Sequence, residues 1–162
     1  MTAVAARPAA QGVVEGAREV RSVAMHDPLV RPLLDELSHE YWTRYQRVLS
    51  AEELRAEMEH YPAQDFAAPP ATGSPAVRTA ELKRIWTHSA HRRRGLARVV
   101  LAELERRAVE RGYRRVYLTT GPRQPEAAGL YLATGYTPLF DTGTDPEEIG
   151  PLAFEKWLEV AP

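Results

Sequence analysis

The stretch IWTHSAHRRRGLA, residues 85–97, joins a predicted strand to a predicted helix and decides how the rest of the chain is interpreted. The strand is expected to begin at Thr79 and to end near His88. The helix is indicated by apolar residues at four-residue spacing: Leu96, Val100, Leu104 and Ala108. We expect it to stop at Gly112, since glycine commonly follows a helix C-terminus.

The residues of this loop suit an anion. Gly95 and Ala97 are small, so the backbone can approach a ligand closely there. The first turn of a helix leaves amide groups without intrahelical partners, and the helix dipole adds positive potential at the same end. Cationic charge comes from Arg92, Arg93 and Arg94, which makes a pyrophosphate the natural occupant. Taken alone, such a basic run is more often a solvated opening to an ordinary helix.

The remaining segments predict a mixed α/β fold. Further strands are expected over residues 19–25, 116–119 and 152–157. Helices are expected to start at Asp27-Pro28, to run from Ser50 to near Tyr61, and to cover residues 125–134. Residues 141–150 are expected to form a polar loop before the last strand.

The composition excludes several classes of function. The 162 residues are 44% hydrophobic and 27% charged with a net charge of -1, which predicts neither nucleic-acid nor membrane binding. The absence of cysteine excludes disulfides, thiolate zinc sites and a cysteine nucleophile. The alanine-rich start lacks the apolar core of a signal peptide, and nothing approaches a membrane span. We expect a cytoplasmic protein with a disordered tail over residues 1–18 and a single domain over residues 19–162.

Residues 92–97 (RRRGLA) and residues 124–136 (QPEAAGLYLATGY) together resemble two motifs of the GNAT superfamily of N-acetyltransferases. Residues 92–97 resemble its Arg/Gln-x-x-Gly-x-Gly/Ala signature, and residues 81–86 resemble its central strand. Residues 124–136 resemble its second motif, Asn-x-x-Ala-x-x-Leu-Tyr with a closing Gly-Phe/Tyr; Gln124 stands where many members have asparagine. The order and spacing of both motifs match, and this combination is specific, whereas either motif alone is not.

The resemblance implies a site for acetyl-coenzyme A. Backbone groups near three residues would meet the acetyl and pantetheine arm: Ile85, Trp86 and Thr87. The pyrophosphate would be held by the Arg92 side chain and by the backbone of Arg93, Arg94, Gly95, Leu96 and Ala97. Gln124 is assigned to the same coenzyme-binding set. No metal is expected, because His88 and His91 have no third ligand beside them in the sequence.

The implied reaction is direct attack of a neutral amine on the thioester, which needs a base, an oxyanion donor and an acid. Tyr131, near the coenzyme sulfur, is the candidate acid, and Glu81 is the candidate base through water. A backbone N–H near Trp86 is the candidate oxyanion donor. Alternatives stay open: Tyr131 could simply pack a helix on the sheet, and Glu81 could bind the amine or lie exposed on its strand.

The acceptor is expected to be a primary amine of a small molecule or peptide, with no nucleic-acid or membrane partner. A homodimer is plausible if a sheet edge is open. The alternative is a degenerate member that binds coenzyme A or a protein partner without catalysis. A nucleic-acid binder is the weakest interpretation, since no recognised motif occurs.

The largest departure from the family is the proline-rich interval over residues 62–79. The family places two long antiparallel strands here, and the interval is short by about two strands. We therefore expect a GNAT-like mixed sheet flanked by helices that lacks the usual second and third strands. The strands could be absent in an inactive or rearranged protein, supplied by a partner chain, or formed by residues missing from this sequence.

Overall fold

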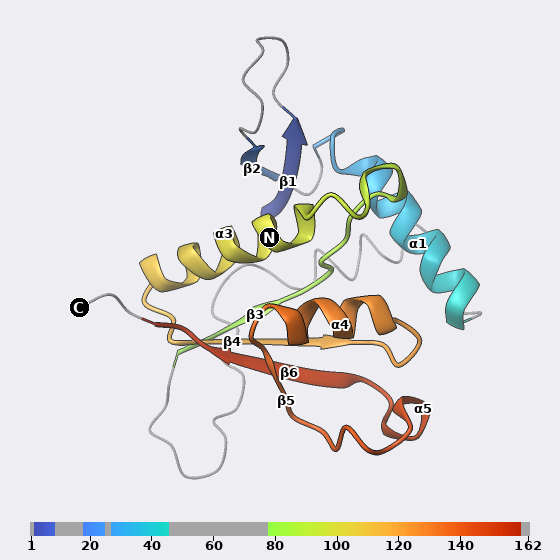
Figure 1. The fold of residues 1–162 in the computed structure, drawn as a ribbon. Helices are drawn as coiled ribbons and strands as arrows, with labels where there is room; N and C mark the ends of the chain where they lie inside the picture. The colour runs from blue at the N-terminus through green and yellow to red at the C-terminus, as the bar shows by residue number, and fades with distance from the viewer. Residues whose placement is uncertain (1, 9–17, 25–26, 46–77, 160–162) are drawn as a thin grey trace. The chain divides into compact units, whose positions relative to one another are not determined.

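The computed structural model describes residues 2–8, 18–24, 27–45 and 78–159 (Figure 1). The chain divides into two compact units, Met1–Gln64 with Trp86–Glu103, and Asp65–Ile85 with Leu104–Pro162. The expectation of a single domain over residues 19–162 stays a prediction. The helix expected from Ser50 to near Tyr61 and the proline-rich interval up to residue 77 lie outside the described residues. The expectation that the usual second and third strands are missing falls on the same residues and stays a prediction.

In the first unit, β1 (Thr2–Pro8) and β2 (Arg18–Ala24) pair antiparallel, with Thr2 opposite Ala24 and Pro8 opposite Arg18. The second strand confirms the one expected over residues 19–25. The first differs from the expected disordered tail, of which residues 9–17 lie outside the described part. The physical reason is that β2 supplies backbone partners to β1, and such pairing leaves no mark in an alanine-rich composition.

Helix α1 (Arg31–Tyr45) begins one turn later than the Asp27-Pro28 pair predicts. The Asp27 carboxylate accepts a hydrogen bond from the Leu29 amide at 2.9 Å, and its carbonyl accepts one from the Val30 amide at 2.9 Å. Asp27 therefore closes a turn ahead of the helix instead of capping the helix itself. Within α1, Leu37 is the buried residue.

The second unit contains a mixed four-stranded sheet in the order β3-β4-β6-β5, which confirms the predicted α/β class (Figure 1). Its strands are β3 (Thr79–Leu82), β4 (Arg115–Thr120), β5 (Thr137–Pro138) and β6 (Leu152–Trp157). β3 runs parallel to β4, whereas β6 is antiparallel to both of its neighbours. The parallel pair is joined by α3 (Leu96–Glu110), as a crossover connection requires.

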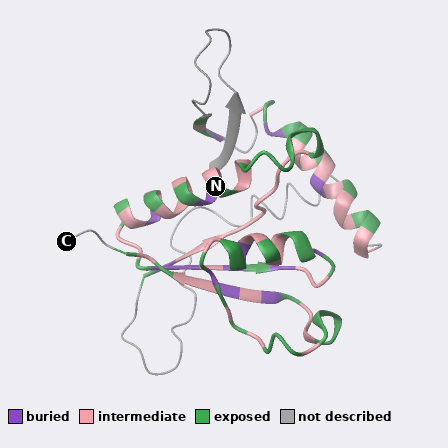
Figure 2. Cartoon of the chain, in the orientation of Figure 1, coloured by how far each residue is buried: buried purple, intermediate pink, exposed green. Residues whose placement is uncertain are grey.

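One face of this sheet carries the core of the second unit. Phe154 is fully buried, and its ring lies 5.5 Å from that of Tyr131 in α4 (Pro125–Ala133) and 5.3 Å from that of Phe140, centroid to centroid. Lys156, two residues further along the strand, shares this face and bonds Glu105 of α3 at 2.8 Å. Helix α4 and the C-terminal half of α3 thus both contact side chains of this face. Figure 2 shows buried residues of β4 and β6 in purple.

Two local expectations need correction. The strand expected to reach His88 ends at Leu82, because Arg84 adopts a left-handed φ of 55° that turns the backbone out of the strand. The loop expected over residues 141–150 contains a short helix, α5 (Pro146–Ile149), whose start is capped by the Asp145 carboxylate on the Glu147 amide at 3.0 Å. Four residues are too few for a periodic signal, although the Asp-Pro pair is a helix-start signal.

Candidate functional site

The predicted anion loop is an exposed turn that leads into α3. Its first part is the 3-10 turn η1 (Ser89–His91), and every residue from 89 to 95 is exposed. Arg93 and Gly95 adopt positive φ values of 59° and 71°, a region that costs a residue with a side chain roughly 1–2 kcal/mol. The amides of Arg93, Arg94 and Gly95 donate to no acceptor among the described residues, so they can bind a ligand oxygen.

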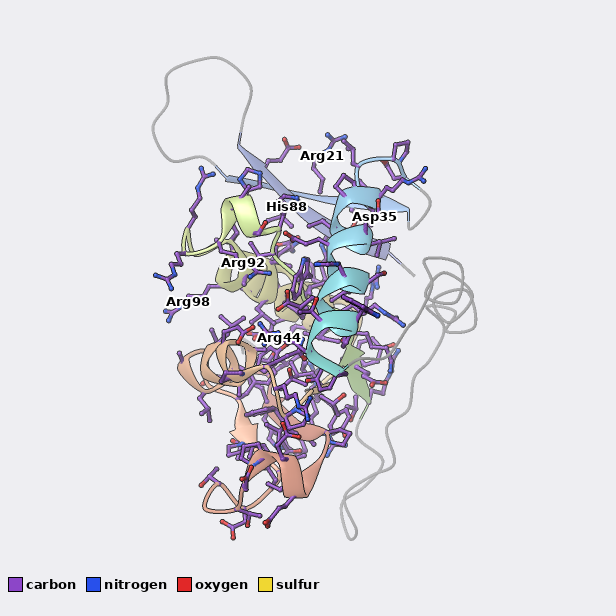
Figure 3. The ribbon with its side chains drawn as sticks, turned by 90° about the vertical axis from the view of Figure 1, so that its right-hand side faces the viewer. Arg21, Asp35, Arg44, His88, Arg92 and Arg98 are labelled. Carbon is purple, nitrogen blue, oxygen red and sulfur yellow. The ribbon has the colours of Figure 1, made fainter. Side chains whose placement is uncertain are left out.

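Side chains around the loop converge on Arg92. The Arg92 guanidinium lies 4.8 Å from the centroid of the Trp86 ring, and its Nε donates to the Thr87 carbonyl at 3.3 Å. The structure therefore brings together Trp86, Thr87 and Arg92, three of the residues assigned to the coenzyme. Figure 3 shows Arg92 and His88 on the loop, with Arg98 on the first turn of α3.

Sequence reasoning missed Glu36, a residue of α1 that contacts this loop. Its carboxylate accepts a hydrogen bond from the Trp86 indole at 2.8 Å and from the Ser89 amide at 2.9 Å and 3.0 Å. Burial opposes ionisation of Glu36, but the hydrogen bonds from Ser89 and Trp86 and the nearby His88 outweigh it and lower the pKa of the carboxyl. No local pattern could have found this contact, because its partners lie 50 and 53 residues away.

The candidate base Glu81 lies on β3 in the second unit. Only 8% of its side chain is exposed, so the alternative of an exposed strand residue is wrong. Oε1 lies 2.9 Å from the Lys83 ammonium, whereas the buried Oε2 has no hydrogen-bond partner in the part of the chain that the structure describes. A buried carboxylate with one uncommitted oxygen suits either proton transfer or amine binding.

Tyr131 and Gln124, two other assigned residues of the second unit, make contacts that stabilise the fold. Tyr131 is 4% exposed and packs against Phe154 and Tyr136, which confirms that it helps to pack α4 on the sheet. Its place beside the coenzyme sulfur stays a prediction. The Gln124 side-chain oxygen accepts from the Thr120 hydroxyl at 3.0 Å and from the Gly121 amide at 3.1 Å, which secures the β4–α4 turn.

The assigned residues are thus divided between the two units. Trp86 to Ala97 belong to the first unit, whereas Glu81, Ile85, Gln124 and Tyr131 belong to the second. Ile85 is half-buried and is the last residue of the Asp65–Ile85 segment of the second unit. The contacts of Ile85 and Gln124 with a coenzyme stay predictions.

Two features are absent from the described ranges: a cluster of metal ligands and a membrane-spanning helix. No group of three or more His, Asp or Glu side chains there is placed to hold a metal ion. No described helix combines the length and the apolar character needed to cross a bilayer.

A sequence model of the acetyltransferase (GNAT) family matches residues 61–136. The match includes the anion loop and the second motif through Tyr136. This match identifies residues 61–136 with a GNAT acetyltransferase domain. No curated protein sequence matches the chain significantly.

Solved structures share the GNAT fold with this domain. A Klebsiella pneumoniae protein assigned to the acyl-CoA N-acyltransferases has 21% identity and a TM-score of 0.58, over 98% of this chain and 99% of its own. An acetyltransferase from Thermus thermophilus has 18% identity and a TM-score of 0.57, over 84% and 94%. The ribosomal-protein-S18-alanine N-acetyltransferase from Escherichia coli has 16% identity and a TM-score of 0.50, over 80% and 90%. At these identities the likeness shows the fold alone.

Proposed function

We propose that this GNAT domain transfers an acetyl group from acetyl-coenzyme A to a primary amine of a small molecule or peptide. The observation that carries the proposal is the loop before α3. Its amides at Arg93, Arg94 and Gly95 are uncommitted among the described residues, and it lies at the positive end of a helix of 15 residues.

These residues fit the coenzyme by their chemistry. A pyrophosphate needs several donors and positive charge at close range, which the backbone of Arg93 to Ala97 and the Arg92 side chain supply together. Gly95 adds no side chain that would fill the space beside these amides. When bound, acetyl-coenzyme A would supply the activated acyl group.

Two side chains would handle protons in this reaction. Glu81, with Oε1 held by Lys83 and Oε2 uncommitted among the described residues, takes the proton of the acceptor amine directly or through water. The Tyr131 hydroxyl is the proposed proton donor on the leaving-group side. Since the chain has no cysteine, we propose direct transfer without an acyl-enzyme.

Calorimetric titration with acetyl-coenzyme A tests this function. We expect micromolar binding by the wild type and none by a double variant, Arg94→Glu with Gly95→Trp, which reverses charge and fills the loop. Arg106→Glu is the matched control, because it makes the same charge change on an exposed residue far along α3. A wild type that binds no coenzyme at millimolar concentration would refute the proposal.

An amine screen monitored by release of free thiol then tests turnover. Thiol release that depends on both the amine and Glu81 supports an N-acetyltransferase. Binding without thiol release from any amine would favour the alternative of a degenerate member that binds coenzyme A without catalysis.

A further inference from the structure

The anion loop, which we propose binds the coenzyme, contributes almost no buried apolar side chains of its own. Residues 89–95 are all exposed, and η1 contains no buried side chain. Its shape must therefore come from polar contacts, because an exposed turn gains little from hydrophobic burial. Its local hydrogen bonds join near neighbours in the sequence: the His88 carbonyl accepts from the His91 amide at 2.8 Å, the His88 Nδ1 accepts from the Ala90 amide at 3.2 Å, and the Ser89 carbonyl accepts from the Arg92 amide at 3.3 Å.

Glu36 supplies the long-range contact that these local bonds lack. Its carboxylate engages two donors of the loop, the indole N–H of Trp86 and the backbone N–H of Ser89. Hydrogen bonds to an ionised carboxylate are stronger than bonds between neutral groups. One side chain of α1 thus holds both the start of the loop and the first residue of its 3-10 turn.

Both partners of Glu36 also contact Arg92. The indole of Trp86 lies under the Arg92 guanidinium at 4.8 Å, and the Ser89 carbonyl receives the Arg92 amide. We propose that Glu36 is a positioning residue, which sets the coenzyme affinity by orienting Trp86 and Ser89 and, through them, Arg92. This inference rests on the proposed function of the loop, and it assigns Glu36 no contact with the coenzyme.

The sign of the effect separates positioning from simple charge. A carboxylate near an anion site repels the anion, so removing its charge should strengthen coenzyme binding if Coulomb forces alone mattered. Positioning predicts the opposite, because loss of the carboxylate releases Trp86 and Ser89. Glu36→Gln removes the charge and keeps one acceptor oxygen, whereas Glu36→Ala removes the charge and both acceptors.

Calorimetry with acetyl-coenzyme A on these two variants is the test. We expect Kd to rise about tenfold for Glu36→Ala and about threefold for Glu36→Gln, as expected for loss of charge-assisted hydrogen bonds that are partly exposed. Asp35→Asn is the matched control, with the same charge change one residue away on α1, where Asp35 faces Arg31 at 3.9 Å. It should leave Kd unchanged within about twofold.

A merely structural role would lower the fraction of active protein, and hence the binding stoichiometry, without changing Kd. Unchanged or tighter binding by Glu36→Ala, or a change matched by Asp35→Asn, would overturn the inference. If Glu36→Ala does not fold, Glu36→Gln decides by the same criteria. A wild type that binds no coenzyme would overturn the proposed function. A wild type that binds coenzyme, with unchanged binding by Glu36→Ala, would overturn only the positioning role of Glu36.

The ligand-free protein gives an independent measurement. The Trp86 indole N–H, assigned by its absence in Trp86→Phe, should exchange with solvent at least about tenfold faster in Glu36→Ala than in the wild type or Asp35→Asn. An unchanged exchange rate would show that Glu36 does not hold the indole, and would overturn the inference whatever the affinities are.

Discussion

Tyr136 should make the protein lose stability at alkaline pH. It closes the second GNAT motif, is 3% exposed, and lies 5.7 Å from Tyr131, ring centroid to ring centroid. Burial, the nearby carboxylate of Glu105 and Tyr131 all disfavour the phenolate, so they raise the pKa of Tyr136 well above its ordinary value of 10.0. The folded protein therefore keeps this proton at pH values where the unfolded chain releases it.

The sign and size of the effect follow from this difference. Above about pH 10 the unfolded state binds fewer protons than the folded state, so the free energy of unfolding falls as pH rises. One such group costs about 1.4 kcal/mol for each pH unit above its unfolded pKa. Between pH 10 and pH 11.5 the loss amounts to about 1.7 kcal/mol, because the tyrosine of the unfolded chain is already half ionised at pH 10. Tyr136→Phe removes the ionisable hydroxyl and with it this loss.

Urea unfolding of the wild type and of Tyr136→Phe at pH 8, 10, 11 and 11.5 measures the effect. All other tyrosines are shared by the two proteins, so their ionisation cancels in the difference between the two free energies. That difference should shift by about 1.7 kcal/mol in favour of the variant from pH 10 to pH 11.5. A difference that stays constant with pH would refute the reasoning, because it would mean that Tyr136 ionises as readily in the folded protein as in the unfolded chain.

Three further substitutions test the catalytic assignment and the packing of the sheet. Glu81→Gln should lower turnover by about a hundredfold or more while leaving the coenzyme Kd unchanged within about twofold; equal turnover in steady-state kinetics would remove Glu81 as the base. Lys156→Met should lower the free energy of unfolding by about 2 kcal/mol, since Lys156 donates to Glu105 at 2.8 Å and to the Thr134 carbonyl at 2.9 Å; a double-mutant cycle with Glu105→Gln that shows no coupling would contradict this. Phe154→Ala should cost about 3–5 kcal/mol in urea unfolding, and a loss below about 1 kcal/mol would mean that the fully buried ring packs poorly.

Elements with a strong local pattern were predictable from the sequence. Helix α3 begins at Leu96 as its four-residue apolar spacing predicts, and β6 covers the expected residues 152–157. The start of α4 at Pro125 also follows from local signals, because proline suits the first helical position. These elements bury one face each, so the periodicity of the sequence and the demands of the core agree.

Elements that depend on distant partners were not predictable. Strand β1 exists through its pairing with β2, and its alanine-rich sequence carries no alternating pattern that would predict it. The sequence predicts that the strand from Thr79 ends near His88, because Ile85 and Trp86 favour a strand. The strand in the structure is shorter, since the left-handed backbone at Arg84 turns the chain out of it. Secondary-structure propensity reflects only residues that are close in the sequence, and tertiary contacts override it where they are stronger.

The same distinction separates the two parts of the proposed coenzyme site. Binding by the loop relies on backbone amides, on Gly95 and on a helix start, which are contiguous in sequence and so form a recognisable motif. Positioning of the loop relies on Glu36, which lies 50 residues from Trp86 and belongs to no motif. A chain could therefore keep every residue of the motif and still bind coenzyme weakly if position 36 lost its carboxylate. On the two proposals made above, the motif predicts which ligand binds, whereas the contact from Glu36 determines how tightly the loop holds it.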